Sequence, residues 1–122
     1  MNDDPGRRLR RGDLFWLTTS DQDDAVAHPH VVVQDDLFNR SRVHTVIVCG
    51  LSSNLHRASE PGNVLLEPGE GGLPRPSVVI VSQIDAIERD RLRERIGTLS
   101  AARVEQILDG LRFQQRAFFR DD

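Results

Sequence analysis

The chain lacks the features that mark membrane, secreted and disulfide-rich proteins. No apolar run among its 122 residues approaches the roughly 20 that a membrane-spanning helix needs. The first residues, Met1 to Arg8, are charged and have none of the hydrophobic core of a signal peptide. A cytoplasmic protein without membrane association is therefore expected. The single cysteine, Cys49, excludes an internal disulfide; its apolar neighbours predict a buried core residue, and a catalytic thiol paired with a histidine stays open.

The signatures of metal and phosphate chemistry are also missing. Four histidines stand at His28, His30, His44 and His56, without the spacing of an HExxH zinc helix. Neither the phosphate-cradling GxxxxGK[ST] motif nor the GxSxG nucleophile elbow is present. We therefore expect no metal and no cofactor. These absences fit a metal-independent nuclease and equally a protein with no catalysis.

The basic residues are all arginine. The chain has 16 basic residues, none of them lysine, and a formal net charge of −3. This balance argues against attraction of nucleic acid by the whole surface, but a local basic groove remains possible. Arginine can hold phosphate with two hydrogen bonds and stack on bases. A GC-rich genome explains the absence of lysine equally well.

Hydrophobic patterning predicts a single domain of many strands followed by one helix. Strands are expected over residues 14–18, 31–33, 43–51, 63–67 and 77–87, the last two as a hairpin around a Gly- and Pro-rich connection. Ser100 is the expected N-cap of a helix, whose apolar stripe consists of Val104, Ile107, Leu108, Leu111 and Phe118. The order indicates an α+β domain over residues 11–120, preceded by a flexible N-terminal segment, residues 1–10.

Four segments, taken in order, point to a known family. Arg11 to Leu17 reads RGDLFWL, Pro61 to Leu66 reads PGNVLL, Gly71 to Leu73 reads GGL, and Ser77 to Asp85 reads SVVIVSQID. This set resembles the MazF/PemK family of toxin endoribonucleases of type II toxin–antitoxin systems. The resemblance implies a small SH3-like β-barrel of the plasmid-maintenance toxin type with a C-terminal helix. It also implies a homodimer whose groove binds single-stranded RNA and is blocked by a cognate antitoxin.

The resemblance also implies a catalytic set. Family members carry a catalytic Arg before a Pro, preceded by an acidic residue; here His28 occupies the Arg position and Asp23 the acidic one. Arg is permanently charged and clamps phosphate, whereas a histidine gains or loses its proton near neutral pH. Ser52 matches a family Thr whose hydroxyl contacts the scissile phosphate. His28, Ser52 and Asp23 are therefore the expected catalytic residues.

Further residues are candidates for RNA binding, each with a plainer interpretation beside it. His30, two residues from His28, shares its face if the strand is regular, yet both can be ordinary strand-edge histidines. Ser53 and Asn54 can contact RNA or complete a turn with Ser52. The remaining candidates are Trp16, which can stack a base but fits core packing better, and Arg40 and Arg57, which can supply the missing positive charge.

Three functions stay open at this point. The favoured one is a metal-independent endoribonuclease toxin that cuts single-stranded RNA to 2′,3′-cyclic phosphate and 5′-OH ends. The second is a non-catalytic toxin on the same barrel with a protein target such as gyrase, acting through its C-terminal residues. The third is a catalytically decayed family member that only binds antitoxin or RNA, which the change from Arg to His28 motivates.

Overall fold

The computed structural model describes residues 8–18 and 26–118, with the backbone alone at 117 and 118. Within these ranges the strands are β1 (Asp13–Thr18), β2 (Ala27–Val32), β3 (Thr45–Ser52), β4 (Val64–Leu66), β5 (Ser77–Glu88) and β6 (Arg95–Thr98). The helical elements are α2 (Asp36–Asn39), η1 (Leu55–Ser59), η2 (Glu70–Gly72), η3 (Arg89–Arg91) and α3 (Ala101–Phe118). None of the helices in the described ranges is long and apolar enough to cross a membrane.

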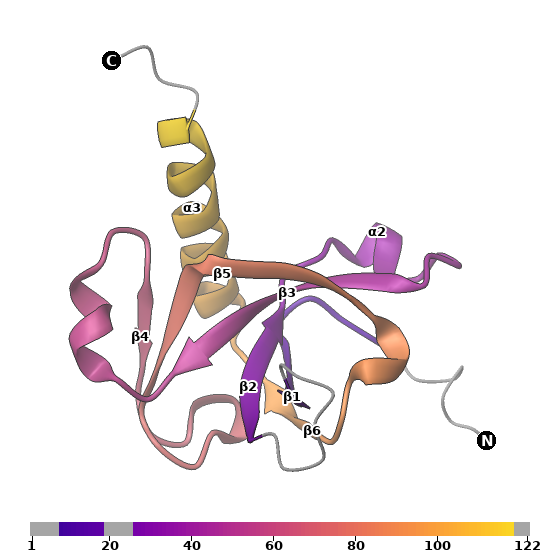
Figure 1. The fold of residues 1–122 in the computed structure, drawn as a ribbon, viewed down its shortest axis with the longest axis horizontal. Helices are drawn as coiled ribbons and strands as arrows, with labels where there is room; N and C mark the ends of the chain where they lie inside the picture. The colour runs from indigo at the N-terminus through magenta and orange to yellow at the C-terminus, as the bar shows by residue number, and fades with distance from the viewer. Residues whose placement is uncertain (1–7, 19–25, 119–122) are drawn as a thin grey trace.

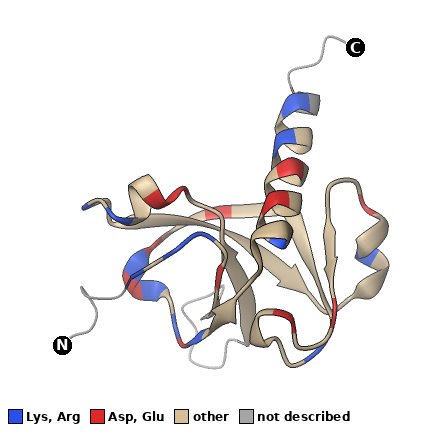
Figure 2. Ribbon diagram, turned by 180° about the vertical axis from the view of Figure 1, so that it is seen from behind, with Lys and Arg blue, Asp and Glu red and all other residues tan. Residues whose placement is uncertain are grey.

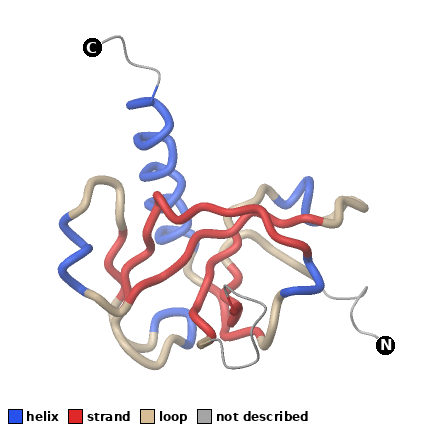
Figure 3. The backbone as a smooth tube through the Cα atoms, viewed as in Figure 1, coloured by secondary structure: helices blue, strands red, loops and turns tan. Residues whose placement is uncertain are grey.

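The six strands found in the described ranges form one curled antiparallel sheet in the order β4-β5-β3-β2-β1-β6 (Figures 1 and 3). The long strand β5 produces much of the curl. Its second half pairs with β3 from Thr45 to Cys49, and its first half pairs with both β4 and the end of β3. Between the two halves, residues 80–83 of β5 stand opposite the single residue Gly50. Such an irregularity bends a strand and increases its twist.

The two edges of the curled sheet approach each other through a contact between glycines. η2 follows β4 at one edge, and β6 forms the other edge. A Cβ on Gly97 of β6 would lie 2.1 Å from the carbonyl oxygen of Gly71 in η2. Gly71 itself has φ +60° and leaves no room for a Cβ against Leu14. The GGL segment therefore serves close packing, which closes the half-barrel.

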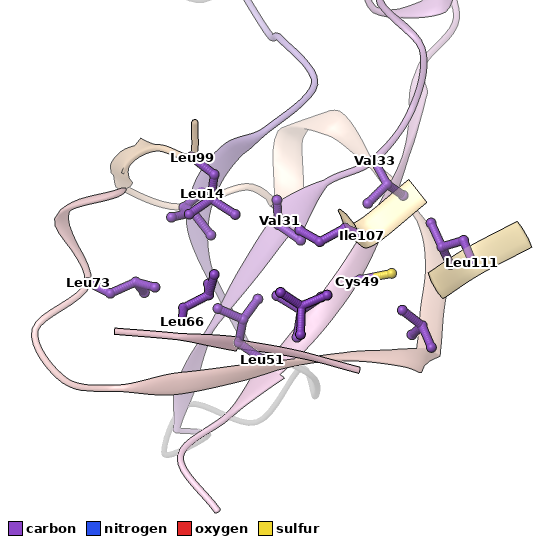
Figure 4. Close-up of a cluster of buried hydrophobic side chains, with 13 residues drawn as sticks. Leu14, Val31, Val33, Cys49, Leu51, Leu66, Leu73, Leu99, Ile107 and Leu111 are labelled. Atoms are coloured by element: carbon purple, nitrogen blue, oxygen red, sulfur yellow. The ribbon is translucent and has the colours of Figure 1, made fainter. Parts of the chain in front are cut away.

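Each face of the sheet has its own core. On one face, α3 packs Ile107 and Leu111 onto a cluster that includes Leu14, Val31 and Cys49 (Figure 4). On the other, a smaller cluster covers only part of the face; its members are Leu9, Phe15, Leu17, Val32, Val46, Val48, Ile87 and Leu92. Burial raises the pKa of the Cys49 thiol to about 12, so Cys49 is an unreactive core residue.

The expected fold class is confirmed, with two differences in its elements. The hairpin of β4 and β5 is present, and Ser100 caps α3 by accepting a hydrogen bond from the Arg103 N–H at 3.2 Å. Strand β2 begins at Ala27, earlier than expected. Pro29 therefore lies within β2 and pairs with Trp16 of β1, in a part of β2 that is not paired with β3. The residues from Arg95 to Thr98, for which no strand was expected, form edge strand β6.

The Arg11-Gly12-Asp13 motif holds β1 to its surroundings. Gly12 has φ +97°, a conformation that other residues rarely adopt. The Arg11 Nε–H donates to the Val33 carbonyl at 2.9 Å. The Asp13 carboxylate is only 1% exposed and accepts from the Thr98 hydroxyl at 2.7 Å and from Arg95 at 3.2 Å. The motif is therefore structural, and Asp13 joins β1 to β6.

Replacing Asp13 by alanine is expected to cost about 2–3 kcal/mol of unfolding free energy, because it removes the hydrogen bonds that this buried, charged carboxylate accepts from Thr98, Arg95 and the Arg10 N–H. Urea denaturation followed by circular dichroism measures this loss. The matched control is Asp109→Ala, which removes an exposed ion pair with Arg112 on α3 and should change stability by no more than about 0.5 kcal/mol. Equal effects of the two substitutions would contradict the bridging role of Asp13.

Candidate active site

Both candidate histidines lie in β2 and face the same side of the sheet. His28 pairs with Leu17 and His30 with Phe15 on β1, in an unbroken register. On the other side, His30 pairs with Gly50 of β3. His28 is exposed and His30 is buried, with 8% of its surface accessible. The side-chain period of a strand puts both on the face that carries Phe15 and Leu17, two members of the smaller core.

The His30 ring is held in one tautomer. Its Nδ1 lies 3.0 Å from the carbonyl oxygen of His28. A carbonyl can only accept, so Nδ1 carries the proton and Nε2 of the neutral ring is an acceptor. Burial lowers the pKa of His30 below 6.5, and the nearby His28 lowers it further; the carbonyl hydrogen bond and Asp85 oppose this shift. His30 is therefore neutral at pH 7, with a basic nitrogen in a defined orientation.

Gly50 creates the space into which His30 and a third side chain converge. A Cβ on Gly50 would lie 2.8 Å from Gln83 Oε1 and 3.5 Å from His30 Nε2. Gln83 is exposed and belongs to the bent part of β5. An imidazole nitrogen and a carboxamide oxygen thus both border the space above a strand position that has no side chain.

Ser52 completes this face at the end of β3. It lies two residues beyond Gly50 and so on the same side of the strand. The pairing of β2 with β3 ends at His30 and Gly50, so Ser52 lies just beyond the paired part of β3 and next to Val78 of β5. The Ser52 hydroxyl oxygen accepts the Asn54 N–H at 3.1 Å, which leaves its own proton available to a ligand. We call His28, His30, Gly50, Ser52 and Gln83 the histidine face.

Two polar side chains in the turn after Ser52 have hydrogen-bond partners within the turn and η1. The Asn54 carboxamide oxygen accepts the His56 N–H at 3.2 Å and caps η1, while Ser53 is exposed. In η1 the Arg57 guanidinium is paired with Glu60 at 3.1 Å, a hydrogen bond that lowers the pKa of Glu60. Asn54 and Arg57 therefore have local structural partners, and only Ser53 among these three is free of them in the described residues.

The other expected site residues are not brought to this face. Trp16, half-buried, occupies an alternate position on β1 and so points to the opposite side of the sheet from His28 and His30. Arg40 follows α2, at the far end of β2 and β3 from Ser52, and Figure 1 shows α2 and η1 on opposite sides of the molecule. Asp23 lies outside the described residues. Arg40 therefore does not lie where it could supply the positive charge that His28 lacks.

Two members of the histidine face were not expected as site residues. These are Gln83 and Gly50. An isolated glycine within an apolar strand, as in Val48-Cys49-Gly50-Leu51, is a known sign of a bulge or of close approach by another group. That signal was present in the sequence, whereas the partner Gln83 depends on the bend in β5.

Acid should destabilise the protein partly through His30. Since the folded-state pKa is lowered below 6.5, the unfolded state binds more protons as pH falls. The contribution of neutral His30 is complete above pH 6.5 and is lost as pH falls from there through the folded-state pKa. Urea unfolding between pH 8 and pH 5 should therefore show a smaller loss for His30→Gln than for the unaltered protein. His44→Gln, an exposed histidine before β3, is the control and should keep the full loss; equal losses for all three would contradict the assignment.

Chemically, this face offers a neutral base at His30, an exposed second imidazole at His28 and a hydroxyl donor at Ser52. Among the described residues, no group of three or more His, Cys, Asp or Glu side chains could hold a metal ion. A base, a second proton-carrying group and a phosphate donor are the parts that phosphodiester cleavage through a neighbouring hydroxyl requires.

The curled antiparallel half-barrel with its C-terminal helix has a MazF-like fold. The chain belongs to the family of PemK-like, MazF-like toxins of type II toxin–antitoxin systems, whose family model matches residues 10–114. It is 35% identical over 107 residues to the endoribonuclease MazF6 of Mycobacterium tuberculosis, covering 85% of this chain and 94% of that protein.

Two solved structures share the fold. A mycobacterial endoribonuclease in complex with its cognate antitoxin superposes with a TM-score of 0.71 at 18% identity, over 90% of this chain and 95% of that one. MazE-MazF from Deinococcus radiodurans superposes with a TM-score of 0.72 at 19% identity, over 90% of this chain and 98% of that one. At these identities the superpositions support the fold alone.

Proposed function

We propose that this toxin is an endoribonuclease that cuts single-stranded RNA without a metal ion, leaving 2′,3′-cyclic phosphate and 5′-OH ends. The observation that carries the proposal is the histidine face, where His28, His30 and Ser52 occupy one side of two neighbouring strands. The 35% identity to an endoribonuclease of the same family supports the activity.

The proposed reaction uses the 2′-hydroxyl of the substrate as its nucleophile. His30 Nε2 takes the 2′ proton, the 2′ oxygen bonds to phosphorus, and the bond from phosphorus to the 5′ oxygen breaks. His28 in its protonated form donates a proton to that leaving oxygen, and the Ser52 hydroxyl donates to a phosphate oxygen as charge develops. The absence of a side chain at Gly50 lets the RNA approach β3, and the Gln83 carboxamide binds the ribose or the base.

The other residues expected at the site have smaller roles in this proposal. Ser53, exposed in the turn, is proposed to contact RNA directly. Asp23 keeps its proposed support of proton transfer on family resemblance alone. Asn54 and Arg57 act by shaping the η1 turn beside Ser52, because their side chains are already bonded locally.

The proposed assembly is a homodimer that a cognate antitoxin inactivates. Solved MazF-like structures that contain an antitoxin support the partner. Light scattering after size-exclusion chromatography tests the dimer, and a monomer at micromolar concentration would oppose it. Residues 11–120 are proposed to act as one toxin domain.

The decisive test is cleavage of a long single-stranded RNA in excess EDTA, followed by analysis of the product ends. The proposal expects cutting in EDTA, 5′ ends that a kinase phosphorylates directly, and 3′ ends that resist polyadenylation until the cyclic phosphate is removed. Products with 5′-phosphates, or cutting only after Mg²⁺ is added, would overturn it. A folded protein that cuts nothing yet remains toxic would favour the non-catalytic alternative with a protein target.

A further inference from the structure

A second site lies at the other end of β2 from the histidine face. A cavity of about 610 Å³ is enclosed by the residues before β1, by α2 with its following loop, and by η3. Four of its lining residues are arginines, namely Arg8, Arg10, Arg40 and Arg89, and one is an acid, Asp36. We call it the arginine pocket. Figure 2 shows the basic positions of these three segments gathered on one side of the molecule.

The positive charge of the arginine pocket is only partly neutralised from within, by the Asp36 carboxylate, whose pKa is lowered, against the effect of burial, mainly by hydrogen bonds and also by the nearby charge of Arg40. No carboxylate among the described residues forms an ion pair with Arg8, Arg10, Arg40 or Arg89. One oxygen of the Asp36 carboxylate also accepts from the Arg11 N–H at 2.8 Å and from the Asn39 side chain at 2.9 Å. A pocket that collects four guanidinium groups around one engaged carboxylate attracts anions.

Arg89 adds a donor that nothing in the described structure satisfies. Its Nη2 donates to the carbonyl oxygens of Phe38 and Asn39, at 3.0 and 2.8 Å, which fixes the guanidinium against α2. Its Nε is buried and has no hydrogen-bond partner. A buried donor without a partner is costly and calls for explanation. Because this Nε is closed to solvent, an anion reaches it only as the Arg89 side chain shifts, and the acceptor oxygen of the anion then satisfies the donor.

We propose that the arginine pocket binds a phosphate group of the RNA backbone, and this inference rests on the proposed function. Guanidinium groups match the oxygens of a phosphate. None of the described residues that line the pocket is aromatic, so it offers no surface on which a base could stack. The pocket therefore recognises the backbone and not the sequence.

The position of the pocket suits a strand that also crosses the histidine face. β2 runs from His28 at one site to Val32, immediately before α2, at the other. At about 3.3 Å per residue, this part of β2 is roughly 13 Å long. One RNA strand lying along β2 would place different phosphates in the two sites. Arg40, which the fold separates from the histidines, thereby regains a contact with RNA.

The test separates binding from cutting by using 2′-O-methylated RNA, which has no nucleophile and cannot be cleaved by the proposed reaction. Fluorescence anisotropy measures its affinity over a range of salt concentrations for the full chain and for Arg10→Gln with Arg40→Gln. If the two arginines hold one phosphate, the double variant should bind at least tenfold more weakly, and the slope of log K against log salt should fall by about 0.7. Arg75→Gln, an exposed arginine in the loop before β5, is the matched control and should leave both values unchanged.

A second measurement observes the pocket directly. In ¹⁵N-labelled protein the Arg89 Nε–H signal, identified by its loss in Arg89→Lys, should shift saturably on titration with inorganic phosphate and with the methylated RNA, and less with chloride. An absent shift would overturn the proposal. A shift with phosphate combined with unchanged RNA affinity of the double variant would also overturn it, in favour of a free phosphate ligand. A tighter response to an acidic peptide than to RNA would assign the pocket to a protein partner instead.

The two proposals fail in distinguishable ways. If methylated RNA fills the arginine pocket but unmodified RNA is never cut, the nuclease proposal fails and the pocket stands. If RNA is cut but neither the salt slope nor the Arg89 signal responds, the pocket proposal fails and the nuclease stands.

Discussion

Replacing Gly110 by alanine is expected to destabilise this protein by about 1–3 kcal/mol, although the substitution improves the helix. Helix propensity alone predicts a gain of about 1 kcal/mol from removing a glycine from the interior of α3. The structure opposes this gain, because a Cβ on Gly110 would lie 2.1 Å from the Gly62 carbonyl oxygen and 3.0 Å from its carbonyl carbon. Both are backbone atoms and cannot rotate away.

The contact between Gly110 and Gly62 is rigid on both sides. Gly62 has φ +84°, and the next residue, Asn63, accepts the Val81 N–H at 3.1 Å through its side chain and donates to the Arg57 carbonyl at 2.9 Å. To accommodate a methyl group, α3 must move away from the segment before β4. That movement would loosen Ile107 and Leu111 from the core, so the overpacking cost should exceed the propensity gain.

Urea denaturation of Gly110→Ala measures the net effect, and Gly69→Ala is its matched control. Gly69 also has a positive φ, +88°, but nothing lies within 4 Å of the position of its Cβ. Its substitution tests backbone strain without a clash and should cost about 1–2 kcal/mol. A rise in stability on Gly110→Ala would show that propensity outweighs the contact and that α3 is not fixed against Gly62.

The fold could be predicted to the extent that local pattern decides it. Alternation and apolar runs located β1, β3, β4 and β5, and the stripe ending in Phe118 located α3. Strand β6 was not predicted, because it is short and contains Gly97. Its pairing also depends on distant groups, since Thr98 and Arg95 donate to the buried carboxylate of Asp13. No local pattern contains a bond between residues 85 positions apart.

One part of the candidate site follows from local sequence pattern, as the fold does, and another part depends on how the strands pair. His28 and His30 fall on one face because the period of a strand is two, which the sequence reveals. His30 and Gln83 both border Gly50 because four residues of β5 stand opposite that single residue of β3. Only the register of the sheet determines this arrangement. Arg40 was expected to supply positive charge at the same site, but the structure places it after α2, at the opposite end of β2 from His28.

His30→Gln is expected to lower kcat for RNA cleavage by about 10²–10⁴-fold, the usual range for loss of a general base. Glutamine can keep a hydrogen bond in this position but cannot accept the 2′ proton. Because burial lowers the pKa of His30, the unaltered enzyme should keep its activity as pH falls to 6.5 and lose it only at lower pH, as His30 becomes protonated. Single-turnover cleavage between pH 5 and pH 9 measures both the rate and this acidic limb, and the limb should vanish in His30→Gln. His44→Gln is the matched control.

A second pair of substitutions tests His28, which the family resemblance places at the position of a catalytic arginine. If His28 donates the proton to the leaving oxygen, His28→Ala should reduce kcat by a similar factor, and His28→Arg should not restore it, since arginine is a poor proton donor. A large gain in activity for His28→Arg would show instead that the chain has lost a phosphate clamp and that its histidine is a mark of decay. Retained cleavage in both His30→Gln and His28→Ala would remove the histidine face from the chemistry altogether, and the base would then have to be sought outside the residues that make up that face.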